Sequence, residues 1–394
     1  MPVHKNTDSA QHVSSNELWR SVLRALENER CLDLRYRANS TSLLDEERVP
    51  NYKVMKQLAL RNQLGLFYRP LVFIGLAMIP AVAVIDWICA VLTSLSPLVR
   101  RSANLHILAT IPVNVGLIES ALSTESDYRA QIVDHDLLVR RRLSADIGLW
   151  RVAICIASHF KLLLHIFRFC EGRRIDLFFH SRDAMVLLML ACYASSKPDH
   201  RFATEDHYQR WAYLLSHHSP NLLIVQHGAL DGAIPFAYPF GSIRTLYLRE
   251  QDGARDFDNY YTVGEKKLFI ATRNFKKNEF SNFGVFIASS FPYIDSEIEL
   301  ARMVKSTCNV SIIVKFHPAH HYDQRRAVLE ALTDHICADD EYPTCQVFVS
   351  QNSFMENDYR AGGIPVFSME RQGGPTATAN AISNHFASIR LALA

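Results

Sequence analysis

Residues 310–318 read Val-Ser-Ile-Ile-Val-Lys-Phe-His-Pro, an apolar run that ends in a lysine, a histidine and a proline. A short apolar run bounded by polar and turn residues is typical of a strand buried in a sheet. Helical patterns stand on both sides of it, at 296–305 and 324–336. We therefore expect a strand at 310–314 between two helices, the arrangement of a parallel sheet covered by helices.

The same alternation continues to the C-terminus. Further strands are expected at 285–288, 346–349 and 365–367, with helices at 354–361 and 377–393. A charged stretch with a glycine, residues 252–258, suggests a linker before this half. The pattern predicts a C-terminal Rossmann-like domain over residues 253–394.

A similar alternation precedes this linker. Strands are expected at 105–110, 175–179 and 222–225, with helices at 115–122, 149–169, 183–195 and 208–216. Residues 101–252 are thus predicted to form an N-terminal Rossmann-like domain, and the fold class is α/β with two such domains. A chain of 394 residues is long enough for two domains and additional elements.

Residues 1–100 form a predicted helical accessory region that contains a hydrophobic segment. From residue 71 to residue 97 the only charged side chain is Asp86. This segment is long enough to cross a bilayer, but Pro80 would kink or break a helix and Asp86 is costly in lipid. A full crossing, a membrane-dipping helix and a protein-buried helix therefore all remain open.

Composition restricts the possible partners and the compartment. The chain is 48% hydrophobic and 21% charged, with a net charge of +2, so it lacks the excess of basic residues typical of nucleic-acid binding. The eight cysteines are scattered without a Cys-x-x-Cys pair, and residues 1–15 are polar without a signal-peptide core. We expect a protein with reduced cysteines in the cytoplasm and no nucleic-acid partner.

The first candidate site follows the predicted strand 222–225. Ligands of parallel α/β sheets bind beyond the carboxyl ends of the strands, and His227 stands there with Gly228 allowing a sharp turn. A histidine at this place suits a general base. An equally good interpretation is a histidine that only hydrogen-bonds the turn. Asp231, in the same loop, could orient the imidazole or replace it as the base.

The second candidate site follows the strand 310–314. Lys315 and His317 share one side of the chain by the period of two and could hold a diphosphate leaving group. The alternative is a surface lysine and a turn histidine. His320, His321 and Asp323 come just after, but their spacing matches no standard metal site, so no metal is expected.

The third candidate site follows the strand 346–349, where Ser350, Asn352 and Ser353 precede a helix that carries Glu356. Free amide groups at the start of this helix could bind an anion, whereas capping alone is the simpler interpretation. Ser289 and Ser290 follow another predicted strand and could also point hydroxyl groups into a site.

Three short motifs carry a resemblance to a known group of enzymes. They are Gln-His-Gly at 226–228, Lys-Phe-His-Pro at 315–318, and Ser-Gln-Asn-Ser at 350–353 followed by Gly-Gly-Ile-Pro-Val at 362–366. In order and position they resemble the GT-B glycosyltransferases of bacterial surface polysaccharides, the group with capsule sialic-acid and Kdo transferases and CDP-glycerol glycerophosphotransferases. The resemblance covers roughly residues 100–385. The paired acids of the sialyltransferases are replaced by single acids, Asp231 and Asp252.

The resemblance implies a function and roles for residues. His227 or Asp231 would be the base, with His317 among the catalytic residues at the donor phosphates. The donor would contact Lys315, Ser350, Asn352, Ser353, Glu356, Ser289 and Ser290. The co-substrate would be a nucleotide sugar, without a further cofactor or a metal, and the acceptor a surface glycan or lipid-linked primer at the inner face of the cell membrane.

Two other functions are compatible with the same motifs. A nucleotide-sugar 2-epimerase shares the two-domain architecture and the strand-end histidines, but typically shows a Ser-Gly-Gly turn with paired glutamates. A non-catalytic subunit of a polysaccharide assembly complex could also have retained the fold.

Overall fold

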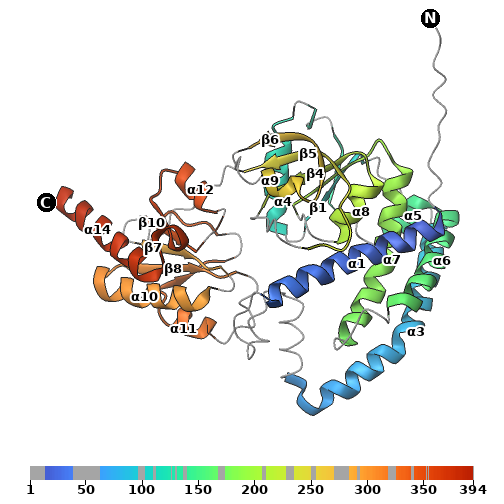
Figure 1. The fold of residues 1–394 in the computed structure, drawn as a ribbon, viewed down its shortest axis with the longest axis horizontal. Coiled ribbons are helices and arrows are strands. Elements are labelled where there is room, and N and C mark those ends of the chain that lie inside the picture. Colours follow the sequence, from blue (N-terminus) through green and yellow to red (C-terminus); the bar gives the residue numbers. More distant parts are fainter. Residues whose placement is uncertain are drawn as a thin grey trace, which may run out of the picture. The chain divides into compact units, whose positions relative to one another are not determined.

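The structure is a computed structural model. The chain forms two compact units, residues 1–35 with 64–269 and residues 36–63 with 270–394. Each unit contains one parallel sheet with helices around it (Figure 1). The described residues are 14–38, 63–95, 103–109, 112–125, 127–128, 131–135, 140–166, 174–205, 210–227, 235–249, 254–269, 284–290, 293–317, 325–338, 341–351, 353 and 355–393.

The sheet of the first unit has six parallel strands in the order β2-β1-β3-β4-β5-β6. Its strands are β1 (Leu105–Leu108), β2 (Val133–Asp134), β3 (Arg201–Thr204), β4 (Leu222–Val225), β5 (Ser242–Leu248) and β6 (Thr262–Leu268). Every residue of β1, β3 and β4 is buried, as expected of central parallel strands covered on both faces.

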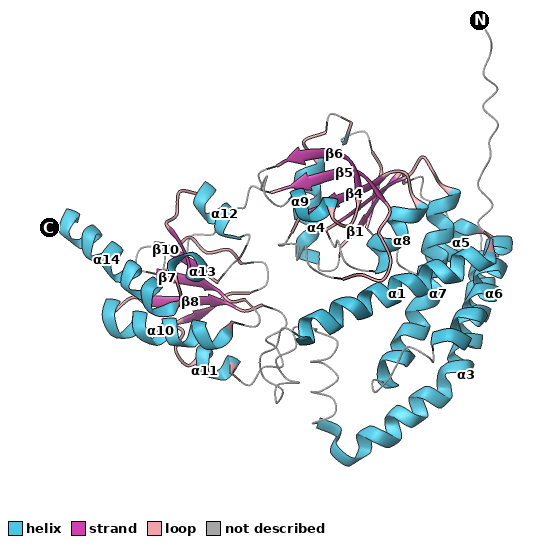
Figure 2. Cartoon of the chain, viewed as in Figure 1, coloured by secondary structure: helices cyan, strands magenta, loops and turns pink. Residues whose placement is uncertain are grey.

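Helices α4 (Pro112–Leu122), α5 (Arg140–Ile147), α6 (Leu149–Ile166), α7 (Arg174–Ser196), α8 (Arg210–His218) and α9 (Ala254–Asp258) belong to this unit. Helix α7 packs against α5, α6 and α8 (Figure 2). The prediction of a strand at 175–179 is wrong, because these residues form the first turns of α7. A short apolar run without turn residues after it is not distinguishable from helix by periodicity alone.

The boundary between the units also lies later than residue 252. Residues 254–258 form α9 rather than a linker, and β6 pairs with β5 as the sixth strand of the first sheet. Glu265, Lys266 and Lys267 make β6 a charged strand at the sheet edge. Charged side chains protect an edge strand from pairing with another chain. A charged strand therefore shows no apolar run by which it could be recognised in the sequence.

Helix α1 (Ser15–Ala38) belongs to the first unit and begins with a capping box. The Glu17 carboxylate accepts a hydrogen bond from the backbone N–H of Ser14 at 3.2 Å, and the Ser14 hydroxyl accepts one from the Glu17 N–H at 3.3 Å. One face of the helix is buried in the core of this unit, through Leu18, Val22, Ala25 and Leu26. Within the described residues of the N-terminal region, α1 thus packs into the core of the first unit.

The hydrophobic segment forms α3 (Tyr68–Ser94), which follows the short 3-10 helix η2 (Gly65–Phe67) and continues through Pro80. Within the described residues, this is the one helix long and apolar enough to cross a membrane by length and composition. One narrow face packs against α5, α6 and α7, and its buried residues are Ile79, Ala83, Asp86 and Ala90. Asp86 therefore faces protein.

The sheet of the second unit has five parallel strands in the order β11-β10-β7-β8-β9. Its strands are β7 (Gly284–Ala288), β8 (Ser311–Lys315), β9 (His335–Ile336), β10 (Val347–Ser350) and β11 (Val366–Ser368). The helix expected at 324–336 is shorter, α11 (Arg326–Glu330), because residues 335–336 pair with β8 instead.

Alternate residues of each strand in this unit face different helices. Val285 and Ile287 share a core with α10 (Ile294–Cys308) and α14 (Pro375–Leu393), whereas Phe286 shares one with Tyr359 of α12 (Met355–Ala361). The short helix α13 (Met369–Gln372) precedes α14. This two-sided burial explains why the strands are continuous apolar runs. Because the strands are parallel, their carboxyl ends lie at the same edge of the sheet.

Candidate functional site

His227 stands at the carboxyl end of β4, where the sequence predicts it, and its side chain is exposed. Its Nδ1 lies 2.6 Å from the backbone oxygen of Glu205, which follows β3. A carbonyl oxygen can only accept, so the neutral imidazole carries its proton on Nδ1. The second ring nitrogen, Nε2, then has the lone pair that a general base requires.

Further polar side chains lie beside His227 at this edge of the first sheet. The buried carboxylate of Glu205 accepts a hydrogen bond from the Asn114 amide of α4 at 3.1 Å. The oxygen of the fully buried Gln226 amide accepts one from the Arg249 N–H at 3.0 Å. Within the described part of the chain, the Gln226 Nε2 has no hydrogen-bond partner. A buried donor of this kind is costly unless a partner satisfies it.

Sequence reasoning missed two of these residues. Glu205 directly follows β3, so the strand-end rule that selected His227 would have selected it had this strand been recognised. Asn114 lies within α4 and has no such signal. Asp231, the alternative base, lies outside the described residues, as does Asn352.

In the second unit, the predicted strand-end residues gather at one edge. Ala288 pairs in register with Ser350 of β10 and with Lys315 of β8. Ser289 continues this edge, and its N–H donates to the Lys315 carbonyl at 2.9 Å. The predicted donor residues Ser289, Lys315 and Ser350 are therefore neighbours at the carboxyl ends of three adjacent strands.

Ser289 and Ser290 hold a buried carboxylate that sequence reasoning missed. The Ser289 hydroxyl donates to Glu297 of α10, and the Ser290 N–H donates to the same carboxylate at 2.6 Å. Burial raises the pKa of Glu297 to about 7, although the two hydrogen bonds act to lower this pKa. A carboxyl group that titrates near neutral pH can give or take a proton, which suits acid–base chemistry.

A second serine–glutamate pair follows β10. The Ser350 hydroxyl donates to the buried carboxylate of Glu356 at 2.7 Å, and Arg360 lies 3.8 Å from that carboxylate. The Ser353 hydroxyl accepts a hydrogen bond from the Met355 N–H at 3.2 Å. The capping role of Ser353 is thereby confirmed, and Ser350 and Glu356 form one polar unit under the start of α12.

Lys315 is held by the protein on one side. Its ammonium donates to the Glu341 carbonyl at 3.0 Å and lies 3.8 Å from the centre of the Tyr342 ring. His317, two residues further, is exposed. A phosphate at this edge would meet the positive charge of the Lys315 ammonium group.

Residues of the types that bind metals also lie close together next to β9, away from the predicted candidate sites. His320, His321 and Asp323 lie outside the described residues. The ligand atoms of His335, Cys337 and Glu341, by contrast, all lie within 4.8 Å of one another next to β9.

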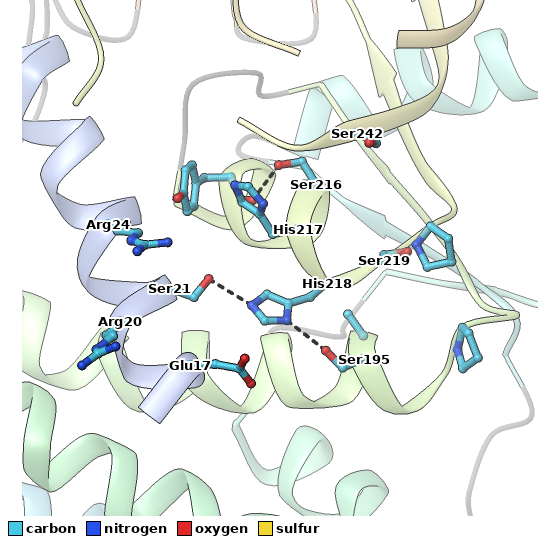
Figure 3. Close-up of a pocket in the computed structure, with 14 residues that line it drawn as sticks. Glu17, Arg20, Ser21, Arg24, Ser195, Ser216, His217, His218, Ser219 and Ser242 are labelled. Atoms are coloured by element: carbon cyan, nitrogen blue, oxygen red, sulfur yellow. Dashed lines mark hydrogen bonds between the residues drawn. The ribbon is translucent and has the colours of Figure 1, made fainter. Parts of the chain in front are cut away.

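A cavity of about 850 Å³ lies in the first unit between α1, the ends of α7 and α8, and the residues at the amino ends of β4 and β5. His218 bonds the Ser195 hydroxyl at 2.9 Å and the Ser21 hydroxyl at 3.0 Å (Figure 3). Burial lowers the pKa of His218 to about 4, so this imidazole is neutral and ties three helices together. Arg20 and Arg24 line the same cavity from α1.

The sequence of the chain matches no protein-family model and no curated protein. The fold itself defines a class. The chain is an α/β protein with two parallel-stranded sheets, consistent with a two-domain Rossmann-like architecture.

Proposed function

We propose that this protein is a glycosyltransferase of the GT-B type. It would move a sugar, or a polyol phosphate, from a nucleotide-activated donor to a surface polysaccharide or a lipid-linked acceptor. The observation that carries the proposal is the geometry of His227. An exposed imidazole at the carboxyl end of a central strand, with Nδ1 held by the Glu205 carbonyl, presents Nε2 as a base.

In the proposed reaction, His227 Nε2 takes the proton of the acceptor hydroxyl as its oxygen attacks the anomeric carbon of the donor. The bond between that carbon and the phosphate oxygen breaks, and the electron pair leaves with the nucleotide phosphate. The strand ends of the second unit are assigned to this leaving group. Lys315 supplies a positive charge there, so negative charge is stabilised without a metal.

The buried serine–glutamate pairs support the donor side of the proposal. Ser289 and Ser350 bond Glu297 and Glu356, so each hydroxyl proton is already directed into the protein. We assign Ser289 and Ser350, with the two glutamates that they bond, to the donor side of the site, and Lys315 with His317 to the donor phosphates.

Helix α3 supports attachment to the inner face of the cytoplasmic membrane. Asp86, the one charged residue between residues 71 and 97, is buried against the protein and would not meet lipid. Phe73, Ile74, Ile85 and Ile88 are each more than half exposed. A helix with one packed face and one apolar outer face suits contact with lipid. Such contact would bring the protein to lipid-linked acceptors.

A nucleotide-sugar 2-epimerase is the second candidate, and one observation favours it. Glu297 and Glu356 are buried acids beside neighbouring strand ends, and the pKa of Glu297 lies near neutrality. Proton removal from a sugar carbon requires a base with such a pKa.

Product analysis separates these functions. The purified protein is incubated with CMP-, CDP-, UDP- and GDP-linked donors, with and without membrane extracts that contain lipid-linked glycans. Transfer that requires the extract supports the glycosyltransferase. Intact but isomerised donor without extract identifies the epimerase, and absence of both binding and turnover identifies a non-catalytic subunit.

A further inference from the structure

His335, Cys337 and Glu341 lie together at the edge of the second sheet. His335 begins β9, Cys337 is buried directly after this strand, and Glu341 follows four residues later in the chain. Their ligand atoms, one nitrogen, one sulfur and one carboxylate oxygen, all lie within 4.8 Å of one another. We propose that these three residues bind a zinc ion.

The distances fit tetrahedral coordination after a small adjustment. With metal–nitrogen and metal–oxygen bonds of about 2.1 Å, tetrahedral ligand atoms lie about 3.4 Å apart, and a sulfur lies about 3.6 Å from either. The His335 Nε2 already lies 3.1 Å from Glu341 Oε1. The sulfur therefore needs to approach by roughly 1 Å at most, a change that side-chain rotation can supply.

The types of ligand select the metal. Magnesium and calcium prefer oxygen ligands alone, whereas zinc accepts imidazole, thiolate and carboxylate together. Three protein ligands leave a fourth position for water, as in zinc sites that are open to solvent. His335 and Glu341 are partly exposed, so an ion can enter from this side.

The second oxygen of Glu341 shows that the carboxylate is oriented. Oε2 accepts a hydrogen bond from the Ala338 N–H at 3.1 Å. Hydrogen bonds of this kind fix ligands in metal sites and strengthen binding. The backbone oxygen of the same residue accepts a proton from the Lys315 ammonium at 3.0 Å, so a bound ion would also fix the carbonyl that holds Lys315.

Binding of the ion would release a proton. A cysteine binds a metal as the thiolate, so its thiol gives up the proton when the metal arrives. As the sulfur–zinc bond forms, the sulfur–hydrogen bond breaks and the proton passes to solvent. The affinity should therefore increase with pH. The site does not depend on the proposed transfer reaction, which uses no metal.

Cobalt titration of the full-length, tag-free, reduced protein tests the proposal. We expect one equivalent of Co²⁺ to produce a thiolate-to-cobalt charge-transfer band, which Zn²⁺ then abolishes. The Cys337→Ser protein should lack the band. The Cys345→Ser protein should keep it, because Cys345 lies in the same core but its sulfur accepts backbone hydrogen bonds. No band in the natural protein, or a band that survives Cys337→Ser, would overturn the proposal.

A second variant keeps the test decisive should Cys337→Ser fail to fold. Glu341→Gln preserves the shape of the side chain and leaves the backbone contact with Lys315 unchanged. Competition with a chromophoric chelator measures zinc affinity in this variant and in the natural protein. We expect the zinc affinity to fall at least roughly 10-fold. This is the lower end of the effect of removing a hydrogen-bond partner of a metal ligand, and loss of the ligand itself should cost no less. Equal affinities would exclude Glu341 as a ligand and overturn the three-residue site.

Discussion

The Nδ1 of His227 lies 2.6 Å from the backbone oxygen of Glu205. This contact joins the carboxyl ends of the neighbouring strands β3 and β4, and it orients an exposed ring. The imidazole is thereby placed in one orientation and one tautomer.

Replacement of His227 should affect stability only slightly. His227→Ala removes the partly exposed hydrogen bond to the Glu205 carbonyl, a loss that should lower the free energy of unfolding by about 0.5–1.5 kcal/mol. His227→Asn, whose amide nitrogen can take the place of Nδ1, should lose less. Urea denaturation of the three proteins measures this. A loss much larger than this range for His227→Ala would mean that the residue has a structural role.

Glu297 should make stability fall as the pH rises. The pKa of this carboxyl is about 7 in the folded protein and near 4.5 in the unfolded chain, so the folded state binds the proton more tightly. Its favourable contribution is complete below pH 4.5 and is lost between about pH 4.5 and pH 7. The loss from this one group is up to about 3 kcal/mol.

Glu297→Gln keeps the side-chain shape but cannot ionise. Denaturation at pH 5 and pH 8 should show a smaller decrease in stability for this variant than for the natural protein. Glu330→Gln, a partly exposed glutamate of α11, provides the matched control. If Glu297→Gln and the natural protein lose the same free energy between these pH values, Glu297 does not titrate in this range.

The pair Ser350–Glu356 should contribute more to stability than the cap formed by Ser353. Ser350→Ala leaves a buried carboxylate without its hydroxyl donor, at a cost of about 1–3 kcal/mol. Ser353→Ala removes a helix cap, which typically costs about 1 kcal/mol. Thermal and urea unfolding of both variants gives the order. The reverse order would show that the Glu356 carboxylate finds another donor.

The outer face of α3 should determine membrane affinity without determining stability. Ile85 and Ile88 are each more than half exposed, so Ile85→Asn/Ile88→Asn should leave the fold intact. Binding to anionic phospholipid vesicles should fall roughly 100-fold, from the lost burial of two apolar side chains. Ala83→Asn, on the buried face, should instead destabilise the protein. Co-sedimentation unchanged by the double substitution would exclude lipid contact through this face.

Most elements of the second unit could be predicted from the sequence, because its strands are fully buried apolar runs separated by amphipathic helices. The expected strand 285–288 corresponds to β7, and 346–349 to β10. Two of the strands that were not predicted lack this apolar signal. β9 has two residues, and β6 is a charged edge strand. Neither has the hydrophobic periodicity that identifies a strand.

The candidate site was predictable where it follows a recognised strand. Lys315, Ser350 and His227 all stand at strand ends, as expected. Glu297 and Glu356 reach these ends from helices, and only the folded chain brings them to Ser289 and Ser350. Such contacts depend on how helix and strand pack, and no local pattern in the sequence records them.

Single-turnover transfer from a nucleotide-activated donor, identified by the product analysis, tests the role of His227 most directly. Because removal of a general base typically slows the chemical step 10²–10⁴-fold, we expect His227→Ala and His227→Asn to lose roughly this much at saturating donor and acceptor. Both variants should still bind the donor. A chemical step as fast in His227→Ala as in the natural protein would contradict the assignment of His227 as the base.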